Sequence, residues 1–257
     1  MIKIIAFGDS TVHGYSGPGG PSIPTQTWPY RLMVRLGETP VESYADVIMN
    51  GYGDQGGFAP PSEGNTLTGV NYTMFNSGVN GENTVQLQSR FQTVIRTLNP
   101  DIAIFSTGVN DLGIMGGTGE YSALNASSRT ITMAKEAAAA GIRPIICLIA
   151  SWGPGTVAWV DEYNGYLAAA AATNGWATVD TGSVLNQGDG SIIPAYTLAG
   201  DGIHRTQAGN QAEADNFPLG LFGSVIKPSA TANDVTLTWN NNTSGGDTWR
   251  IERRIIS

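Results

Sequence analysis

The chain has 257 residues, of which 41% are hydrophobic and 13% are charged, and it carries a net charge of −8 with a pI near 4.6. This length permits one large domain, or one domain with an appendage. The acidic balance argues against a nucleic-acid partner, which needs clustered Lys and Arg, and against attraction to anionic membranes.

The first residues and the cysteine count narrow the class further. Residues 1–7 are too short for the apolar core of a signal peptide, and no segment has the roughly 18 unbroken apolar residues of a membrane span. We therefore expect a soluble protein, cytoplasmic unless the native chain is longer and is secreted or particle-associated. The one cysteine, Cys147, excludes a disulfide within the chain and is interpreted as a buried hydrophobe. Composition leaves the oligomeric state open.

Short apolar runs alternate along the chain with longer amphipathic stretches. The predicted strands span 2–8, 73–76, 101–106, 143–149 and 176–179. The predicted helices span 28–36, 84–97, 126–140, 159–173 and 206–215. Five βα units of this length predict a three-layer α/β/α domain over residues 1–227, with a flavodoxin-like, five-stranded parallel sheet.

Two stretches depart from this repeat. Residues 47–72 are rich in Gly, Asn and Pro, and we expect a long surface loop that forms part of a substrate rim. Residues 228–257 form a β-rich tail with a strand, turn and strand pattern, which predicts a short β-hairpin. The tail resembles the start of a fibronectin type III-like module. It is either packed on the main domain or part of a truncated accessory module.

Polar residues follow the first predicted strand and reappear near residue 200. Ser10 stands between Gly8 and Gly14, where a sharp turn can lift a hydroxyl out of the sheet. Asp201 and His204 are close enough for one turn to place a carboxylate against an imidazole, the base and orienter that a serine nucleophile needs. Taken singly, the first pattern could be a plain turn and the second a helix cap.

Two more polar segments follow the second and third strands, at 76–82 and 107–111. Each offers uncharged donors, backbone N–H groups of glycine and the amide of Asn110, of the kind that stabilises an oxyanion. Because the carboxyl ends of parallel strands meet at one edge of a sheet, we expect all four segments to converge there.

Over about residues 3–216, these four segments resemble the blocks of the SGNH hydrolase (GDSL esterase/lipase) superfamily. The resemblance implies that Ser10 is the nucleophile, that His204 is the general base and that Asp201 orients it. It also implies an oxyanion hole of the Ser10 and Gly81 N–H groups and the Asn110 side chain, with Gly78 shaping the turn. Thr11 departs from the motif, which has Leu at that position.

The expected activity is serine-dependent hydrolysis of short-chain or O-acetyl esters, linked to carbohydrate, through an acyl-enzyme. Trp152, Met115 and His13 are candidate substrate contacts, while Asp9 and Asp111 are interpreted as residues that fix the loops. With two His and one Cys there is no zinc pattern, and the Gly-rich segments lack the Lys-Ser/Thr of a phosphate loop, so we expect no metal and no cofactor. The alternatives are a lipase or thioesterase for longer acyl chains, or a non-catalytic carbohydrate-binding domain with a relic site.

Overall fold

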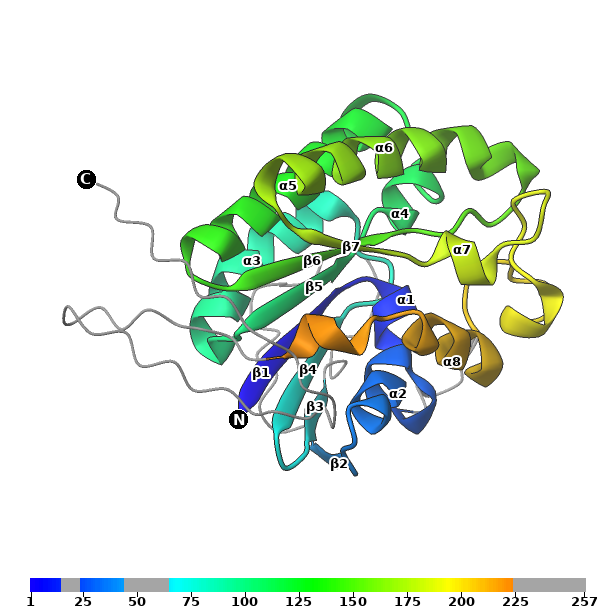
Figure 1. Cartoon of the computed structure of the whole chain (residues 1–257). Coiled ribbons are helices and arrows are strands. Elements are labelled where there is room, and N and C mark those ends of the chain that lie inside the picture. Colours follow the sequence, from blue (N-terminus) through cyan, green and yellow to red (C-terminus); the bar gives the residue numbers. More distant parts are fainter. Residues whose placement is uncertain (15–23, 44–64, 224–257) are drawn as a thin grey trace.

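A seven-stranded sheet runs through the computed structural model, which describes residues 1–14, 24–43 and 65–223 (Figure 1). The strands, in the order β2-β3-β4-β1-β5-β6-β7, are β1 (Ile2–Gly8), β2 (Val41–Ser43), β3 (Asn65–Thr68), β4 (Tyr72–Gly78), β5 (Ile102–Ser106), β6 (Arg143–Leu148) and β7 (Ala177–Asp180). The five strands from β4 to β7 in this order are parallel to one another.

All five predicted strands are present, but the prediction of a five-stranded sheet was wrong. Strands β2 and β3 add antiparallel pairs at one edge, β3 against β4 and β2 against β3. Strand β3 lies within the stretch 47–72 that was expected to be a surface loop. Its four residues, among many Gly and Asn, are too few to show an alternating pattern. Residues 47–64 lie outside the described part of the chain.

The five predicted helices are also present, the largest shift being at the start of α5, predicted at 126 and found at 123. The α-helices are α1 (Ser10–His13), α2 (Trp28–Arg35), α3 (Thr84–Leu98), α4 (Val109–Leu112), α5 (Ala123–Ala139), α6 (Val157–Asn174), α7 (Gly182–Leu185) and α8 (Gln207–Asp215). Short 3₁₀ turns are η1 (Pro24–Gln26), η2 (Gly119–Tyr121), η3 (Pro154–Thr156), η4 (Pro194–Tyr196) and η5 (Leu219–Phe222).

The helices cover both faces of the sheet in three layers, with α3, α5 and α6 on one face and α2 and α8 on the other (Figure 1). Alternation along β1 shows how the strands serve both cores. Ile5 and Phe7 join the cluster under α3, α5 and α6, whereas Ile4 and Ala6 join the cluster under α2 and α8. The sequence of a strand buried on both faces is therefore continuously apolar.

The strand ends are aligned in register at one edge of the sheet. Gly8, the last residue of β1, pairs with Gly78 of β4 and with Ser106 of β5. Helix α1 begins two residues after Gly8 and α4 three residues after Ser106. The segments that follow β1, β4 and β5 therefore leave the sheet side by side, as expected for a parallel sheet.

Gly78 has a different role from the one expected. It is the final, extended residue of β4 rather than part of a turn. A Cβ atom there would lie 2.2 Å from the His13 backbone nitrogen and 2.8 Å from the Asp9 carbonyl oxygen. Glycine is required because α1 packs directly on the end of β4.

The β-hairpin predicted in residues 228–257 lies outside the described residues, and the domain boundary at residue 227 stays a prediction. Within residues 1–14, 24–43 and 65–223, no helix is both long and apolar enough to cross a membrane.

Candidate active site

Ser10 is the first residue of helix α1 and is 5% exposed. The Asp9 side chain caps this helix, because its Oδ1 accepts hydrogen bonds from the Thr11 backbone N–H at 2.9 Å and from the Thr11 hydroxyl at 2.8 Å. Thr11, the departure from the family motif, thus supplies a second bond to the cap. Asp9 fixes the turn from which Ser10 emerges.

The loop closed by a β-bridge just before helix α8 carries Asp201 and His204. The bridge pairs Thr197 with Arg205, and the Leu198 N–H donates to the His204 carbonyl at 2.9 Å. Gly202, between the two polar residues, has a φ of +78°, a backbone conformation that favours glycine. The turn therefore holds the carboxylate and the imidazole on the same side of the chain.

The three side chains form a continuous hydrogen-bonded series. His204 Nε2 lies 2.8 Å from Ser10 Oγ, and His204 Nδ1 lies 2.8 Å from Asp201 Oδ2. With a proton on Nδ1 donated to the carboxylate, Nε2 is free to accept the serine proton. Ser10 and His204, whose side chains meet here, are 194 residues apart in sequence.

The second oxygen of Asp201 secures the turn itself. Oδ1 accepts the backbone N–H groups of Ile203 at 2.9 Å and of His204 at 2.7 Å. Burial opposes ionisation of Asp201, but these N–H groups and the His204 imidazole outweigh it and hold the pKa of the carboxyl below its usual value. Asp201 is therefore ionised at neutral pH.

A buried group of charges adjoins the imidazole turn. Arg205 Nε lies 3.1 Å from Glu213 Oε2 of helix α8, and neither side chain is more than 4% exposed. Burial raises the pKa of Glu213, and it raises the pKa of Asp9 in spite of the nearby Arg205 charge. The ion pair fastens the residue after His204 to α8.

The expected oxyanion donors lie on the neighbouring segments. Asn110, 6% exposed on α4, donates through Nδ2 to the Glu82 carbonyl at 2.8 Å, so its amide lies against the loop that contains Gly81. Gly81 has a φ of +76° with no atom within 4 Å of a hypothetical Cβ, so its glycine identity follows from backbone conformation rather than from packing. An amide carries two N–H bonds, and the contact with Glu82 uses one of them.

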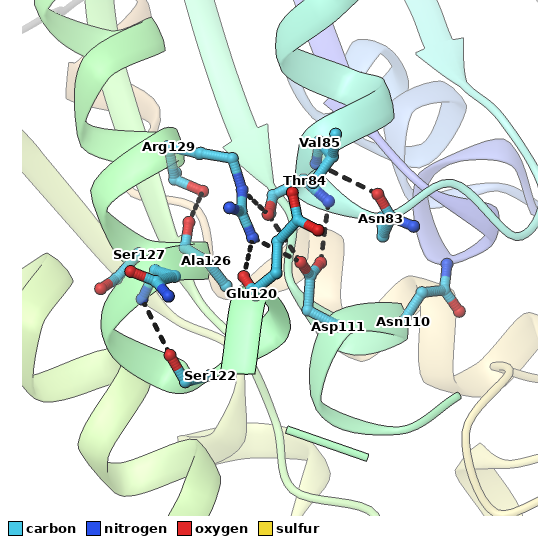
Figure 2. Close-up of polar contacts among 12 residues, drawn as sticks. Asn83, Thr84, Val85, Asn110, Asp111, Glu120, Ser122, Ala126, Ser127 and Arg129 are labelled. Carbon is cyan, nitrogen blue, oxygen red and sulfur yellow. Dashed lines mark hydrogen bonds and ion pairs between the residues drawn. The ribbon is translucent and has the colours of Figure 1, made fainter. Parts of the chain in front are cut away.

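Asp111 joins the two donor segments. It is fully buried and accepts the Thr84 backbone N–H at 2.8 Å and the Thr84 hydroxyl at 2.6 Å. Figure 2 shows Arg129 of α5 reaching the same place, with Nε 2.8 Å from Thr84 Oγ1 and Nη2 3.4 Å from Asp111 Oδ1. The start of α3 is thereby fixed to α4, which agrees with the interpretation of Asp111 as a residue that fixes the loops.

The candidate substrate residues lie around these groups to different degrees. Trp152 follows β6, and its ring would lie 3.2 Å from a Cβ at Gly113, three residues after Asn110. Met115 is 40% exposed, and its N–H donates to the Asn110 carbonyl at 3.0 Å. His13 ends helix α1 and is partly buried. All three therefore border segments of the site.

Several charged residues that position the site were not singled out from the sequence. They are Arg90, Arg129, Arg205 and Glu213. A signal existed for two of them. Arg90 and Glu213 occur at the spacing of the buried faces of α3 and α8, beside Phe91 and Ala214, where an apolar residue is the ordinary choice.

In chemical terms, this edge of the sheet offers a hydroxyl, a base in contact with it, a carboxylate behind the base and neutral N–H donors nearby. Such an arrangement can perform nucleophilic acyl transfer without a metal ion. Among the residues that the structure describes, there is no group of three or more His, Cys, Asp or Glu that could hold one.

Comparison with known proteins gives one family model that matches residues 6–212, described as the GDSL-like lipase/acylhydrolase family. This range includes Ser10, Gly81, Asn110, Asp201 and His204. No curated protein sequence matches the chain.

Solved structures similar to this chain are known from several bacteria. One is a member of the lipolytic protein G-D-S-L family from Veillonella parvula, with 20% identity, a TM-score of 0.58 and coverage of 84% of this chain and 96% of that one. The acetyl xylan esterase AlAXEase has 17% identity, a TM-score of 0.57 and coverage of 84% and 97%. Est24, a carbohydrate acetylesterase from Sinorhizobium meliloti, has 14% identity, a TM-score of 0.57 and coverage of 83% and 95%. At these identities the likeness is one of fold.

Proposed function

Because the chain belongs to the GDSL-like lipase/acylhydrolase family, and is therefore an ester hydrolase, we propose that Ser10 is its nucleophile and that its substrates are short-chain or O-acetyl esters of carbohydrates. The observation that carries the proposal is the series from Ser10 through His204 to Asp201, with two contacts of 2.8 Å.

The first half of the reaction forms an acyl-enzyme. Ser10 Oγ attacks the ester carbonyl carbon while its proton passes to His204 Nε2. The carbonyl oxygen becomes an oxyanion that accepts hydrogen bonds from the N–H groups of Ser10 and Gly81 and the Asn110 amide. His204 then gives the proton to the alkoxide oxygen as the C–O bond breaks, and the alcohol leaves.

The second half repeats the sequence with water. His204 takes a proton from the water molecule, whose oxygen attacks the acyl carbon, and the proton returns to Ser10 as the acid departs. Removal of one oxyanion donor in a comparable enzyme costs about 10²–10³ in kcat, so three donors account for much of the acceleration.

The preference for small acyl groups on carbohydrate has two supports. Two structural relatives are an acetyl xylan esterase and a carbohydrate acetylesterase. Trp152, partly buried beside the Asp201–His204 turn, offers an aromatic face of the kind on which sugar rings stack, and Met115 and Ile114 add exposed apolar surface. An acetyl group needs little more than the space beside Ser10.

The test is a substrate series with matched variants. We expect kcat/KM to be highest for p-nitrophenyl acetate, to fall as the acyl chain lengthens, and acetate to be released from acetylated xylan. Ser10→Ala and His204→Ala should each lose turnover by about 10⁶-fold, by analogy with serine proteases, without loss of thermal stability. A fluorophosphonate should label Ser10, as read by peptide mass.

Two results would count against the proposal. If Ser10→Ala turns over substrate at a rate comparable to that of the unmodified enzyme, Ser10 is not the nucleophile. A maximum of kcat/KM at octanoyl or longer chains, with no acetate released from polysaccharide, would identify lipids or thioesters as the substrate class instead.

A further inference from the structure

Arg90 of helix α3 lies at the meeting point of the segments that form the site, although it lies outside the hydroxyl, imidazole and carboxylate series. The side chain is 6% exposed, and its guanidinium lies 4.3 Å from the centroid of the Phe7 ring. A cation is rarely buried without full pairing, so its partners indicate what it does.

Those partners come from three separate segments. Nη2 donates to the Ser77 carbonyl at 2.8 Å and to the Gly8 carbonyl at 3.3 Å, while Nη1 donates to the Ser77 hydroxyl at 2.7 Å. Nε donates to Glu82 Oε2 at 2.7 Å. One planar group therefore binds the end of β1, the end of β4 and the loop that follows β4.

Two of these partners, Gly8 and Glu82, lie close in sequence to proposed catalytic groups. Gly8 is two residues before Ser10, and Glu82 is next to Gly81. The Glu82 carbonyl also accepts the Asn110 amide at 2.8 Å. Movement of Glu82 would thus shift both the Gly81 N–H and the Asn110 side chain relative to the serine.

We propose that Arg90 is a positioning residue for the oxyanion hole, holding the Gly81–Glu82 loop and, through it, Asn110 in fixed relation to Ser10. The inference rests on the function proposed above. Glu82 neutralises the guanidinium, so Arg90 acts through geometry rather than through charge on the reacting oxygen. Lysine offers one ammonium in place of a rigid fork of donors and cannot reproduce the set.

The experiment compares Arg90→Lys with a matched control, Arg143→Lys. Arg143 is a partly buried arginine that, like Arg90, donates to backbone carbonyls, those of Leu221 and Gly223. It is the first residue of β6 and so lies at the end of that strand away from the proposed site. With p-nitrophenyl acetate, we expect Arg90→Lys to lower kcat at least tenfold and by no more than the about 10²–10³-fold cost of a deleted donor, with KM within about threefold. Arg143→Lys should lower the melting temperature and leave kcat unchanged.

A double variant separates positioning from general bracing. If Arg90 acts through the donors, Arg90→Lys combined with Asn110→Ala loses less than the product of the two single losses, because both changes damage one unit. Ser77→Ala, which removes the Nη1 acceptor alone, gives a milder version of the same decrease in kcat should Arg90→Lys fail to fold.

Losses that multiply, or a kcat in Arg90→Lys and Ser77→Ala equal to that of the parent, would overturn the inference. The Ser10→Ala variant, measured alongside, keeps the two proposals distinct. If it still turns over, the proposed function fails; if it is inactive while Arg90→Lys is unimpaired, only the role of Arg90 fails.

Discussion

Asp201 uses its two carboxylate oxygens for different tasks. Oδ1 holds the backbone of the turn through the N–H groups of Ile203 and His204, and Oδ2 orients the imidazole. An asparagine keeps one oxygen acceptor and replaces the other with a donor. The substitution therefore separates the structural task from the catalytic one.

We expect Asp201→Asn to lower kcat less than Ser10→Ala does. By analogy with subtilisin, the loss should be about 10⁴-fold against about 10⁶-fold, because the backbone contacts still hold the turn. Single-turnover rates with p-nitrophenyl acetate measure both. Equal losses would mean that the carboxylate is as indispensable as the serine and would contradict this ordering.

Asp201 also makes stability depend on pH. Its folded pKa lies below the ordinary value of 3.8, so its contribution is complete above that pH and is lost as the pH falls through the lower, folded value. The free energy of unfolding of the parent should therefore decrease more steeply than that of Asp201→Asn below about pH 4. Urea unfolding at several pH values tests this; parallel curves would refute it.

Three glycines give a graded prediction about backbone and packing. Gly78→Ala forces a Cβ within 2.2 Å of the His13 nitrogen and should cost about 1–3 kcal/mol or more, together with activity. Gly81→Ala meets no atom within 4 Å but keeps a φ of +76°, which should cost about 1–2 kcal/mol.

Gly165→Ala is the control for these changes, because it is an exposed helical site with no atom within 4 Å of the added Cβ. It should gain about 0.5–1 kcal/mol. Chemical denaturation of the three variants ranks them, and a neutral Gly78→Ala would contradict the close approach of α1 to β4.

At the scale of elements, the amino end of α3 is the joint between the two donor segments. The Thr84 hydroxyl contacts both Asp111 Oδ1 and Arg129 Nε (Figure 2). Thr84→Val removes these two contacts and keeps the backbone N–H bond to Asp111. The joint is then held by fewer bonds, while the shape of the side chain is preserved.

We expect Thr84→Val to destabilise the protein by about 1–3 kcal/mol, because a buried carboxylate loses a hydrogen-bond donor. It should also lower kcat, since α3 follows directly after the Gly81–Glu82 loop. Thr97→Val, on the exposed side of the same helix, should stay within about 0.5 kcal/mol. Thermal unfolding and kcat are measured for Thr84→Val and Thr97→Val. Identical behaviour of the two variants would contradict the role of Thr84 in holding α3 to α4.

The elements differ in how far the sequence could predict them. The strand 102–106 and the helix 84–98 bury apolar side chains in a regular sequence pattern, and both were predicted almost to the residue. Strands β2 and β3 were missed because three and four residues cannot show a period. Their place in the sheet depends on long-range pairing with β4, which local composition does not encode.

The candidate site shows the same division. Ser10, Asn110 and His204 could be proposed from the sequence because each follows a strand or turn in a recognisable segment. Arg90 could not, since its function depends on which carbonyls the folded sheet ends bring together. Gly78 was singled out from the sequence, but the reason that glycine is required there was not found. The close approach of α1 to this residue is visible only in three dimensions.

On the scale of the whole molecule, the net charge of −8 sets how charged substrates approach. An anionic ester is repelled at low ionic strength, and salt screens that repulsion over a Debye length of about 10 Å at 0.1 M. We expect kcat/KM for 4-acetoxybenzoate to rise severalfold between low and moderate salt, while that for p-nitrophenyl acetate stays constant. An equal response of both esters would show that salt acts on the enzyme itself.

The contact between α2 and α8 joins parts of the chain that are distant in sequence. Trp28 stacks on Phe217 with ring centroids 5.1 Å apart, and its backbone N–H donates to Asn210 Oδ1 at 3.2 Å. His204 reaches Ser10 across 194 residues on the loop that leads into α8. Under the proposed function, a polypeptide that is still being translated has the Ser10 hydroxyl without its base until the segment from Asp201 to Phe217 has been made and has docked. We expect ester cleavage to begin only after that docking, so that the onset of turnover reports the folding of this segment.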